Sequence, residues 1–154
     1  MAVSKAYDDL IMDHIKNARG FRVLADATHH ADGSNPLCGD ELTVYLTLVG
    51  ERIESAAFQC TCCGISMASA SIMTESVRGK SRAEARAWLA EFVSALAARA
   101  EVAPPGAGDA HCALLETVQQ FPARTRCAML PWVTLEAALD NRKEPVAMTG
   151  SEPS

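Results

Sequence analysis

The feature that most constrains this chain is a set of potential metal ligands that lie far apart in the sequence. Cys38 and Asp40 flank Gly39, and glycine lets the backbone turn tightly enough for a thiolate and a carboxylate to face one ion. Two ligands do not complete a metal site. The further candidates, Cys63 and Cys127, follow after intervals of 25 and 64 residues. The fold itself therefore has to bring three segments of the chain together.

Length and charge exclude several classes of protein. A chain of 154 residues that is 49% hydrophobic is long enough for one domain with a core, which we expect over residues 1–140. The net charge of −5, with scattered basic residues, argues against binding to nucleic acid. No apolar run reaches the roughly 18 residues that span a bilayer, and the first ten residues lack the pattern of a signal peptide. We therefore expect a cytoplasmic protein that binds no membrane.

The chain contains six cysteines, an unusual number for a cytoplasmic protein of this size. The reducing cytosol keeps such thiols free, so we expect metal or sulfur chemistry rather than a disulfide framework. Free cysteines also serve as small buried hydrophobes, and we expect that role for two or three of the six. Cys60 and Cys112 are the sites that best fit this packing role.

The first half of the chain changes from a helical to a strand pattern. Apolar spacing of three and four predicts a helix over residues 4–17, and an irregular crossing is expected over 18–34. Strict alternation over 42–49 predicts a strand, Gly50-Glu51 a turn, and residues 52–59 a second strand. This hairpin would place Asp40 at one end of the first strand and the cysteine cluster at the exit of the second.

The second half of the chain is mainly helical. We expect a small-residue helix after Cys63, and Ser81 with Glu84 forms a capping box for a helix over 81–100. A loop over 101–110, a short helix through Val118 and a final helix ending near Leu139 follow. Pro131 is expected in the first turn of that last helix, and residues 141–154 as a disordered tail. Cys63 and Cys127 would then lie at helix starts, where a thiolate is stabilised.

Three cysteines and one aspartate satisfy the tetrahedral requirement of zinc. Spacing alone makes this prediction only moderately specific, because the chain lacks the paired C-x-x-C motifs of common structural zinc sites. The six cysteines also permit other choices of ligand.

Four stretches of the chain resemble the U-type iron-sulfur cluster assembly proteins, and within them the SufU branch. The resemblance implies an α+β fold in which a small antiparallel sheet packs against helices. It also implies metal ligation by Cys38, Asp40, Cys63 and Cys127. The matching stretches are YDDLIMDHIKN (7–17), NPLCGD (35–40), ISMASAS (65–71) and FPARTRCAMLPW (121–132).

Two features favour SufU over the related IscU scaffolds. Arg126 stands where IscU proteins carry a histidine before their last cysteine, and the long interval from Cys63 to Cys127 resembles a SufU insertion that contains the predicted helix over 81–100. Arg124 matches an arginine of the SufU pattern and would neutralise a thiolate-rich site.

One stretch departs from the family pattern. Cys60-Thr61-Cys62 stands where relatives have small or acidic residues, which leaves Cys62 as an alternative ligand or as an extra thiol for sulfur storage. The spacing to Ile65 favours Cys63 as the ligand.

The resemblance implies a zinc-dependent sulfur acceptor that works with a pyridoxal-phosphate-dependent cysteine desulfurase of the SUF system. Cys38 would take up the persulfide sulfur, Asp40 would stay on the metal, and the sulfur would pass to a downstream scaffold or apo-protein. A second possibility is a scaffold on which a [2Fe-2S] cluster is built and handed on. A third is a structural zinc domain, which the mixed Cys and Asp ligands disfavour.

Overall fold

Alternating hydrophobic residues build the centre of the sheet. The computed structural model describes residues 9–36 and 39–148. In β2 (Asp40–Val49) the side chains of Leu42, Val44 and Leu46 are buried. The strand pairs antiparallel with β3 (Arg52–Thr61) through a turn at Gly50, whose φ of 62° favours glycine. The predicted hairpin is therefore confirmed.

The sheet has four strands in the order β3-β2-β1-β4. Strand β1 (His29–Asn35) pairs antiparallel with β2, whereas β4 (Val146–Ala147) pairs parallel with β1, so the sheet is mixed. The expectation of an irregular crossing over 18–34 was wrong for β1. Its polar sequence lacks the apolar alternation that predicts a strand. At Gly33 an added Cβ would collide with Thr134 of the facing helix, so this position has no room for a side chain.

The stretch after residue 140 also differs from the expected disordered tail. Met148 is buried, and its backbone N–H donates to the carbonyl of Ser34 over 2.9 Å. Asn141 Oδ1 accepts a hydrogen bond from the backbone N–H of His30. Edge pairing with β1 uses backbone groups, which a polar sequence supplies as well as an apolar one. The part of the expected tail over 149–154 lies outside the described residues.

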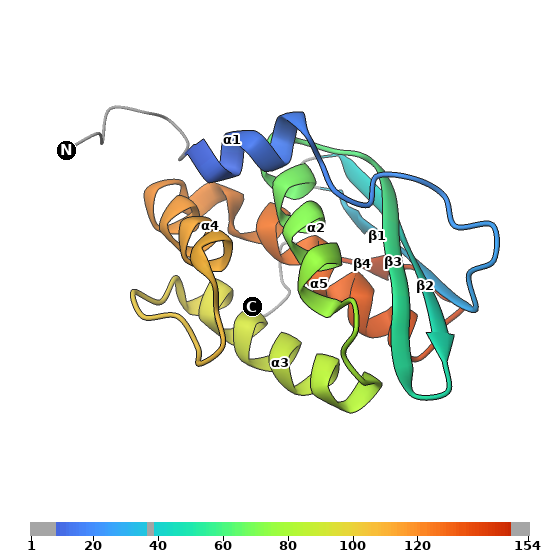
Figure 1. The fold of residues 1–154 in the computed structure, drawn as a ribbon. Helices are drawn as coiled ribbons and strands as arrows, with labels where there is room; N and C mark the ends of the chain where they lie inside the picture. Colours follow the sequence, from blue (N-terminus) through green and yellow to red (C-terminus); the bar gives the residue numbers. More distant parts are fainter. Residues whose placement is uncertain (1–8, 37–38, 149–154) are drawn as a thin grey trace.

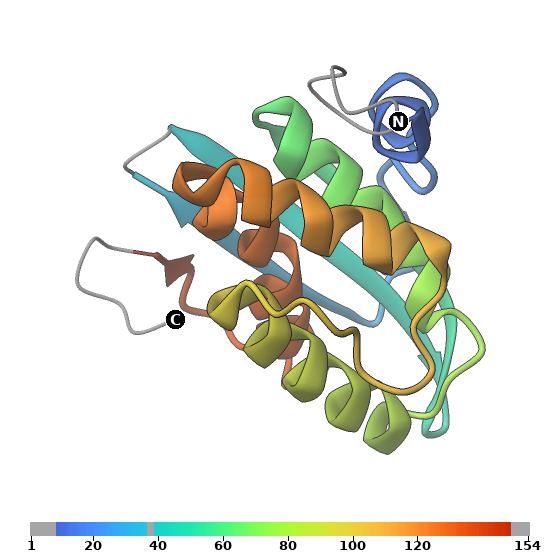
Figure 2. The same cartoon turned by 90° about the vertical axis from the view of Figure 1, so that its left-hand side faces the viewer.

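Helices cover one face of the sheet, which gives the α+β architecture expected from the resemblance (Figure 1). Helices α2 and α5 pack against the strands, and α1, α3 and α4 lie outside them (Figure 2). No described helix has the length and apolar character needed to cross a membrane. The helices are α1 (Asp9–Lys16), α2 (Gly64–Val77), α3 (Arg82–Ala98), α4 (Asp109–Gln120) and α5 (Thr125–Leu139), with a short 3-10 helix η1 (Pro122–Arg124) before α5.

A local signal places the start of α3 correctly. Ser81 Oγ accepts from the backbone N–H of Glu84, whose carboxylate accepts from the backbone N–H of Ser81, so the predicted capping box begins α3. On α1, His14 is buried and its Nδ1 lies 2.6 Å from Ser71 Oγ.

The position of Pro131 was predicted wrongly. It lies inside α5 rather than in the first turn. Proline has no N–H, so the carbonyl four residues earlier, that of Cys127, loses its usual helical donor. The hydroxyl of Ser66 on α2 donates to that carbonyl over 2.9 Å. A contact between helices thus replaces the missing hydrogen bond within the helix.

His111 on α4 is held neutral inside an aromatic cluster. Its ring lies 4.9 Å from Trp88, 5.2 Å from Phe92 and 6.2 Å from Trp132, measured between ring centres. Nδ1 accepts from the backbone N–H of Gly108, which leaves Nε2 to donate to Ser76 Oγ over 2.7 Å. Burial, with smaller effects of Lys80 and His14, lowers the pKa of His111 to about 4.

This histidine should make stability fall in acid. Above pH 6.5 it is neutral in both states; below that the unfolded chain binds a proton that the native cluster excludes until about pH 4. We expect a loss of about 2 kcal/mol of unfolding free energy across this window, after allowance for partial exposure. Urea unfolding of the wild type and of His111→Gln should show that the difference between their unfolding free energies shrinks as the pH falls. Parallel pH curves would contradict this assignment.

Candidate metal centre

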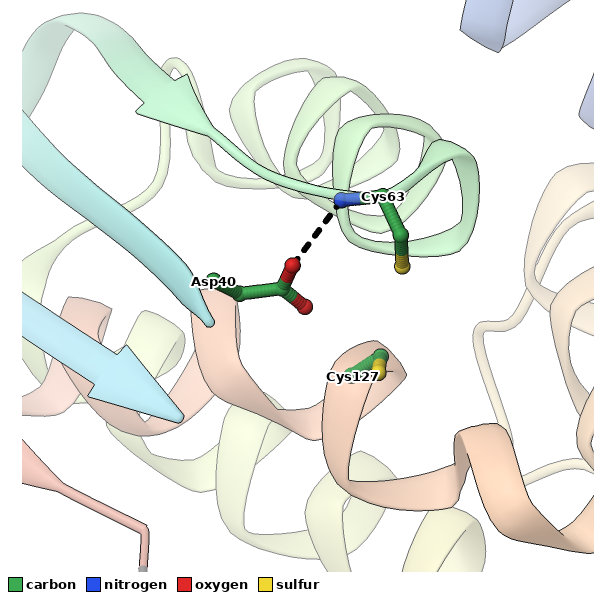
Figure 3. A group of neighbouring side chains, drawn as sticks. All are labelled: Asp40, Cys63 and Cys127. Atoms are coloured by element: carbon green, nitrogen blue, oxygen red, sulfur yellow. Dashed lines mark hydrogen bonds between the residues drawn. The ribbon is translucent and has the colours of Figure 1, made fainter. Parts of the chain in front are cut away.

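Three side chains from distant segments converge at one end of the sheet. The carboxylate of Asp40 and the sulfurs of Cys63 and Cys127 all lie within 4.8 Å of one another (Figure 3). Asp40 begins β2, Cys63 immediately precedes α2, and Cys127 lies in the first turn of α5. The fold thus brings together three of the four residues that the sequence suggested as ligands. The fourth, Cys38, lies outside the described residues.

Asp40 is held in place by the strand pairing and by α2. It pairs with Asn35 across the β1–β2 turn, where Gly39 has a φ of 75° and donates its N–H to the carbonyl of Asn35. Its Oδ1 accepts from the backbone N–H of Cys63 over 3.0 Å, and its Oδ2 lies 2.9 Å from Ser66 Oγ, whose single proton it shares with the Cys127 carbonyl. The buried carboxylate therefore holds the residue that precedes α2 and a side chain of its first turn beside the start of β2.

Cys63 is an activated thiol. Its pKa is lowered to about 6, chiefly by a hydrogen bond with Cys127 and also by hydrogen bonds with Ser66, while burial and the charge of Asp40 oppose the shift. A thiol with such a pKa is mostly thiolate at neutral pH, which is the form that binds metal.

Cys127 is buried completely, just inside α5 rather than ahead of its start as expected. Asn35 Nδ2 lies 4.0 Å from its sulfur. Ser66, which sequence reasoning missed, contacts all three residues of the centre. Its hydroxyl reaches Asp40 Oδ2 and the Cys127 carbonyl and lies 3.8 Å from the Cys63 sulfur. The available signal was its position three residues after Cys63, on the same helix face.

The remaining cysteines lie apart from this group. Cys60 and Cys62 form a disulfide, so the expectation of free thiols was wrong for this pair, and Cys62 is not brought together with Asp40 and Cys127. Cys112 is a free, exposed thiol on α4 rather than the packed residue expected. Arg124 is exposed in η1, three positions before Cys127.

The chemistry of the converging atoms fits a metal ion. Two thiol sulfurs and one carboxylate oxygen match the ligand types of zinc, which binds them at about 2.3 and 2.0–2.2 Å. The carboxylate oxygen and the two sulfurs lie within 4.8 Å of one another. Small side-chain rotations would bring all three atoms to those bond lengths from one ion. A fourth ligand is needed for tetrahedral coordination.

Comparison with known proteins identifies the family. The family model described as the NifU-like N-terminal domain matches residues 6–141. The chain belongs to this family. Two relatives resemble it over most of its length. The zinc-dependent sulfurtransferase SufU of Bacillus subtilis is 38% identical over 84% of this chain and 86% of its own. The iron-sulfur cluster assembly scaffold protein IscU of Thermotoga maritima is 35% identical over 94% of this chain and 100% of its own.

A solved structure has the same fold. It is a crystal structure from Fervidobacterium islandicum AW-1 titled as a putative iron-sulfur cluster assembly scaffold protein for the SUF system. It superposes with a TM-score of 0.78 at 30% identity and covers 87% of this chain and 96% of its own.

Removing the Ser66 hydroxyl should weaken the metal centre. Ser66→Ala loses the contacts to Asp40 and to the Cys127 carbonyl, and loss of such an outer partner typically lowers metal affinity by about tenfold or more. Competition with a chromophoric zinc chelator measures the affinity. Ser69→Ala is the matched control, because Ser69 is equally buried on α2 but contacts the Ala128 carbonyl and Trp132. Equal losses in both variants would contradict a specific role for Ser66.

Proposed function

We propose that the protein acts in iron-sulfur cluster assembly as a zinc-dependent sulfur acceptor. Its sulfur would come from the persulfide of a pyridoxal-phosphate-dependent cysteine desulfurase and pass to a scaffold or apo-protein. The observation that carries the proposal is the convergence of Asp40, Cys63 and Cys127. The likeness to a SufU protein named as a zinc-dependent sulfurtransferase supports it.

Cys38, Asp40, Cys63 and Cys127 would hold the zinc ion. When bound, zinc supplies a positive charge that keeps the thiolates deprotonated. Cys38 precedes Asp40 by two positions in the sequence, which makes it the natural fourth ligand beside the three described ones. Arg124, an exposed cation three positions before Cys127, would offset the negative charge of the thiolates.

The sulfur transfer is assigned to Cys38. Its thiolate would attack the outer sulfur of the desulfurase persulfide, forming a new S–S bond while the desulfurase cysteine leaves as a thiolate. Asp40 keeps its hydrogen bonds to Cys63 and Ser66, so the start of β2 stays beside α2 while Cys38 carries the sulfur.

Changing Cys38 to alanine should abolish sulfur acceptance. Because Cys38 is the proposed attacking thiolate, the Cys38→Ala chain should gain no sulfur when it is incubated with the desulfurase and cysteine. Intact-mass spectrometry with alkylation detects the added sulfur. Cys112→Ser, which alters an exposed thiol on α4, should behave as wild type. Normal persulfide loading of Cys38→Ala would exclude the assignment.

The second candidate function is a scaffold for a [2Fe-2S] cluster at the same residues. The likeness to IscU scaffold proteins over nearly the whole chain favours it, and thiolates are the usual ligands of such clusters. Elemental analysis with acid-labile sulfide on anaerobically purified protein separates the two functions. The sulfur-acceptor function predicts about one zinc per chain without sulfide, whereas a scaffold predicts iron and sulfide in comparable amounts.

A further inference from the structure

The Cys60–Cys62 disulfide lies beside the metal centre but is not part of it. Cys60 is the second-last residue of β3, and Cys62 directly precedes Cys63. The two Cα atoms are 5.6 Å apart, and both residues are only partly buried. Their sulfur chemistry is therefore accessible, unlike that of a cysteine buried for packing alone.

The strand register fixes the pair next to Asp40. Cys60 lies opposite Leu42, two residues after Asp40, and the N–H that follows Cys62 donates to the Asp40 carboxylate. Cys62 is thus one residue along the chain from Cys63, a residue of the metal centre.

Both cysteines of the pair reach solvent. Cys60 and Cys62 are each partly exposed, so a small reductant reaches the disulfide without displacing the buried residues of the metal centre. The pair is therefore open to thiol exchange, whereas Cys127 is fully buried.

We propose that Cys60 and Cys62 are a redox-active pair that reduces persulfide sulfur to sulfide. The inference rests on the proposed function for the origin of the persulfide. It adds an activity to sulfur acceptance, because it lets the chain release sulfur in the oxidation state that cluster assembly consumes.

The reaction begins with a transfer to Cys62. The Cys62 thiolate attacks the outer sulfur of a persulfide, a bond forms between the two sulfurs, and the donor cysteine leaves as a thiolate. The Cys60 thiolate then attacks Cys62 Sγ. The bond from Cys62 to the terminal sulfur breaks, and that sulfur leaves with the electron pair as hydrosulfide.

The second step produces the disulfide present in the structure. Two thiols lose two electrons and two protons in total, and the terminal sulfur gains the two electrons. A dithiol reductant regenerates the partly exposed pair by thiol–disulfide exchange.

The test measures sulfide release in a single turnover. The full-length protein is reduced, freed of reductant under anaerobic conditions and given limiting glutathione persulfide. We expect wild type to release about one sulfide per chain while the Cys60–Cys62 disulfide forms. Sulfide is measured colorimetrically, and the disulfide is mapped by alkylation and mass spectrometry.

Two variants locate the two steps. Cys60→Ser should stall with a persulfide on Cys62, and Cys62→Ser should leave the pair unreactive, so both should release sulfide at least about tenfold more slowly. Cys112→Ser is the control and should match wild type. Thermal unfolding and zinc content confirm that each variant is folded. Wild-type rates in both variants, or sulfide release without the disulfide, would overturn the proposal.

The same variants separate this inference from the proposed function. Repeating the assay with the desulfurase and cysteine as the sulfur source tests whether the chain accepts sulfur from the desulfurase. If the desulfurase transfers no sulfur but glutathione persulfide is reduced by the pair, the proposed function fails and the inference stands. If the desulfurase loads the chain but sulfide release is the same in all variants, the inference fails and the proposed function stands.

Discussion

The carboxylate of Asp40 is the interaction on which the metal centre depends. It joins the start of β2 to the start of α2 through the N–H of Cys63 and the hydroxyl of Ser66. A buried carboxylate is costly unless it is hydrogen-bonded, and the N-terminus of a helix favours negative charge. A carboxylate has about four acceptor positions, so Asp40 can accept both hydrogen bonds and still offer lone pairs to a metal ion. The contacts that hold β2 beside α2 are therefore compatible with the ligation that we propose for this residue.

The fold itself brings the three described residues of the centre together. The β1–β2 turn fixes Asp40, the exit of β3 fixes Cys63, and the first turn of α5 fixes Cys127. Ordering the ligands by folding removes part of the entropy that metal binding would otherwise cost. It also leaves two soft sulfurs and one hard oxygen close together, a set that suits both zinc and iron. The ligand types alone accordingly do not choose between a sulfur acceptor and a cluster scaffold.

Sequence reasoning succeeded where a pattern is local and failed where a neighbour decides. Alternation in β2 and the capping box at Ser81 are read from adjacent residues, and both are correct. Strand β1 is polar, and its pairing depends on β2 and on the space that Gly33 leaves for Thr134. Three of the proposed ligands converge as expected because each ends or begins a recognisable element. The Cys60–Cys62 bond was not predicted, because a reducing cytosol was expected to keep all six thiols free.

Pro131 shows how a local defect and the site geometry are linked. Because it has no N–H, the Cys127 carbonyl is available to Ser66, whose hydroxyl also reaches Asp40. One turn further along α2, Ser69 donates to the Ala128 carbonyl and accepts from Trp132 Nε1. Two serines three residues apart thus match two successive carbonyls at the start of α5. At Ala128 the usual helical donor, the backbone N–H of Trp132, belongs to α5, so Ser69 uses the second lone pair of that carbonyl. At Cys127 Pro131 removes the helical donor, and Ser66 supplies a hydrogen bond from α2 instead. The defect in α5 is therefore compensated by a contact between the two helices that carry Cys63 and Cys127 at their starts.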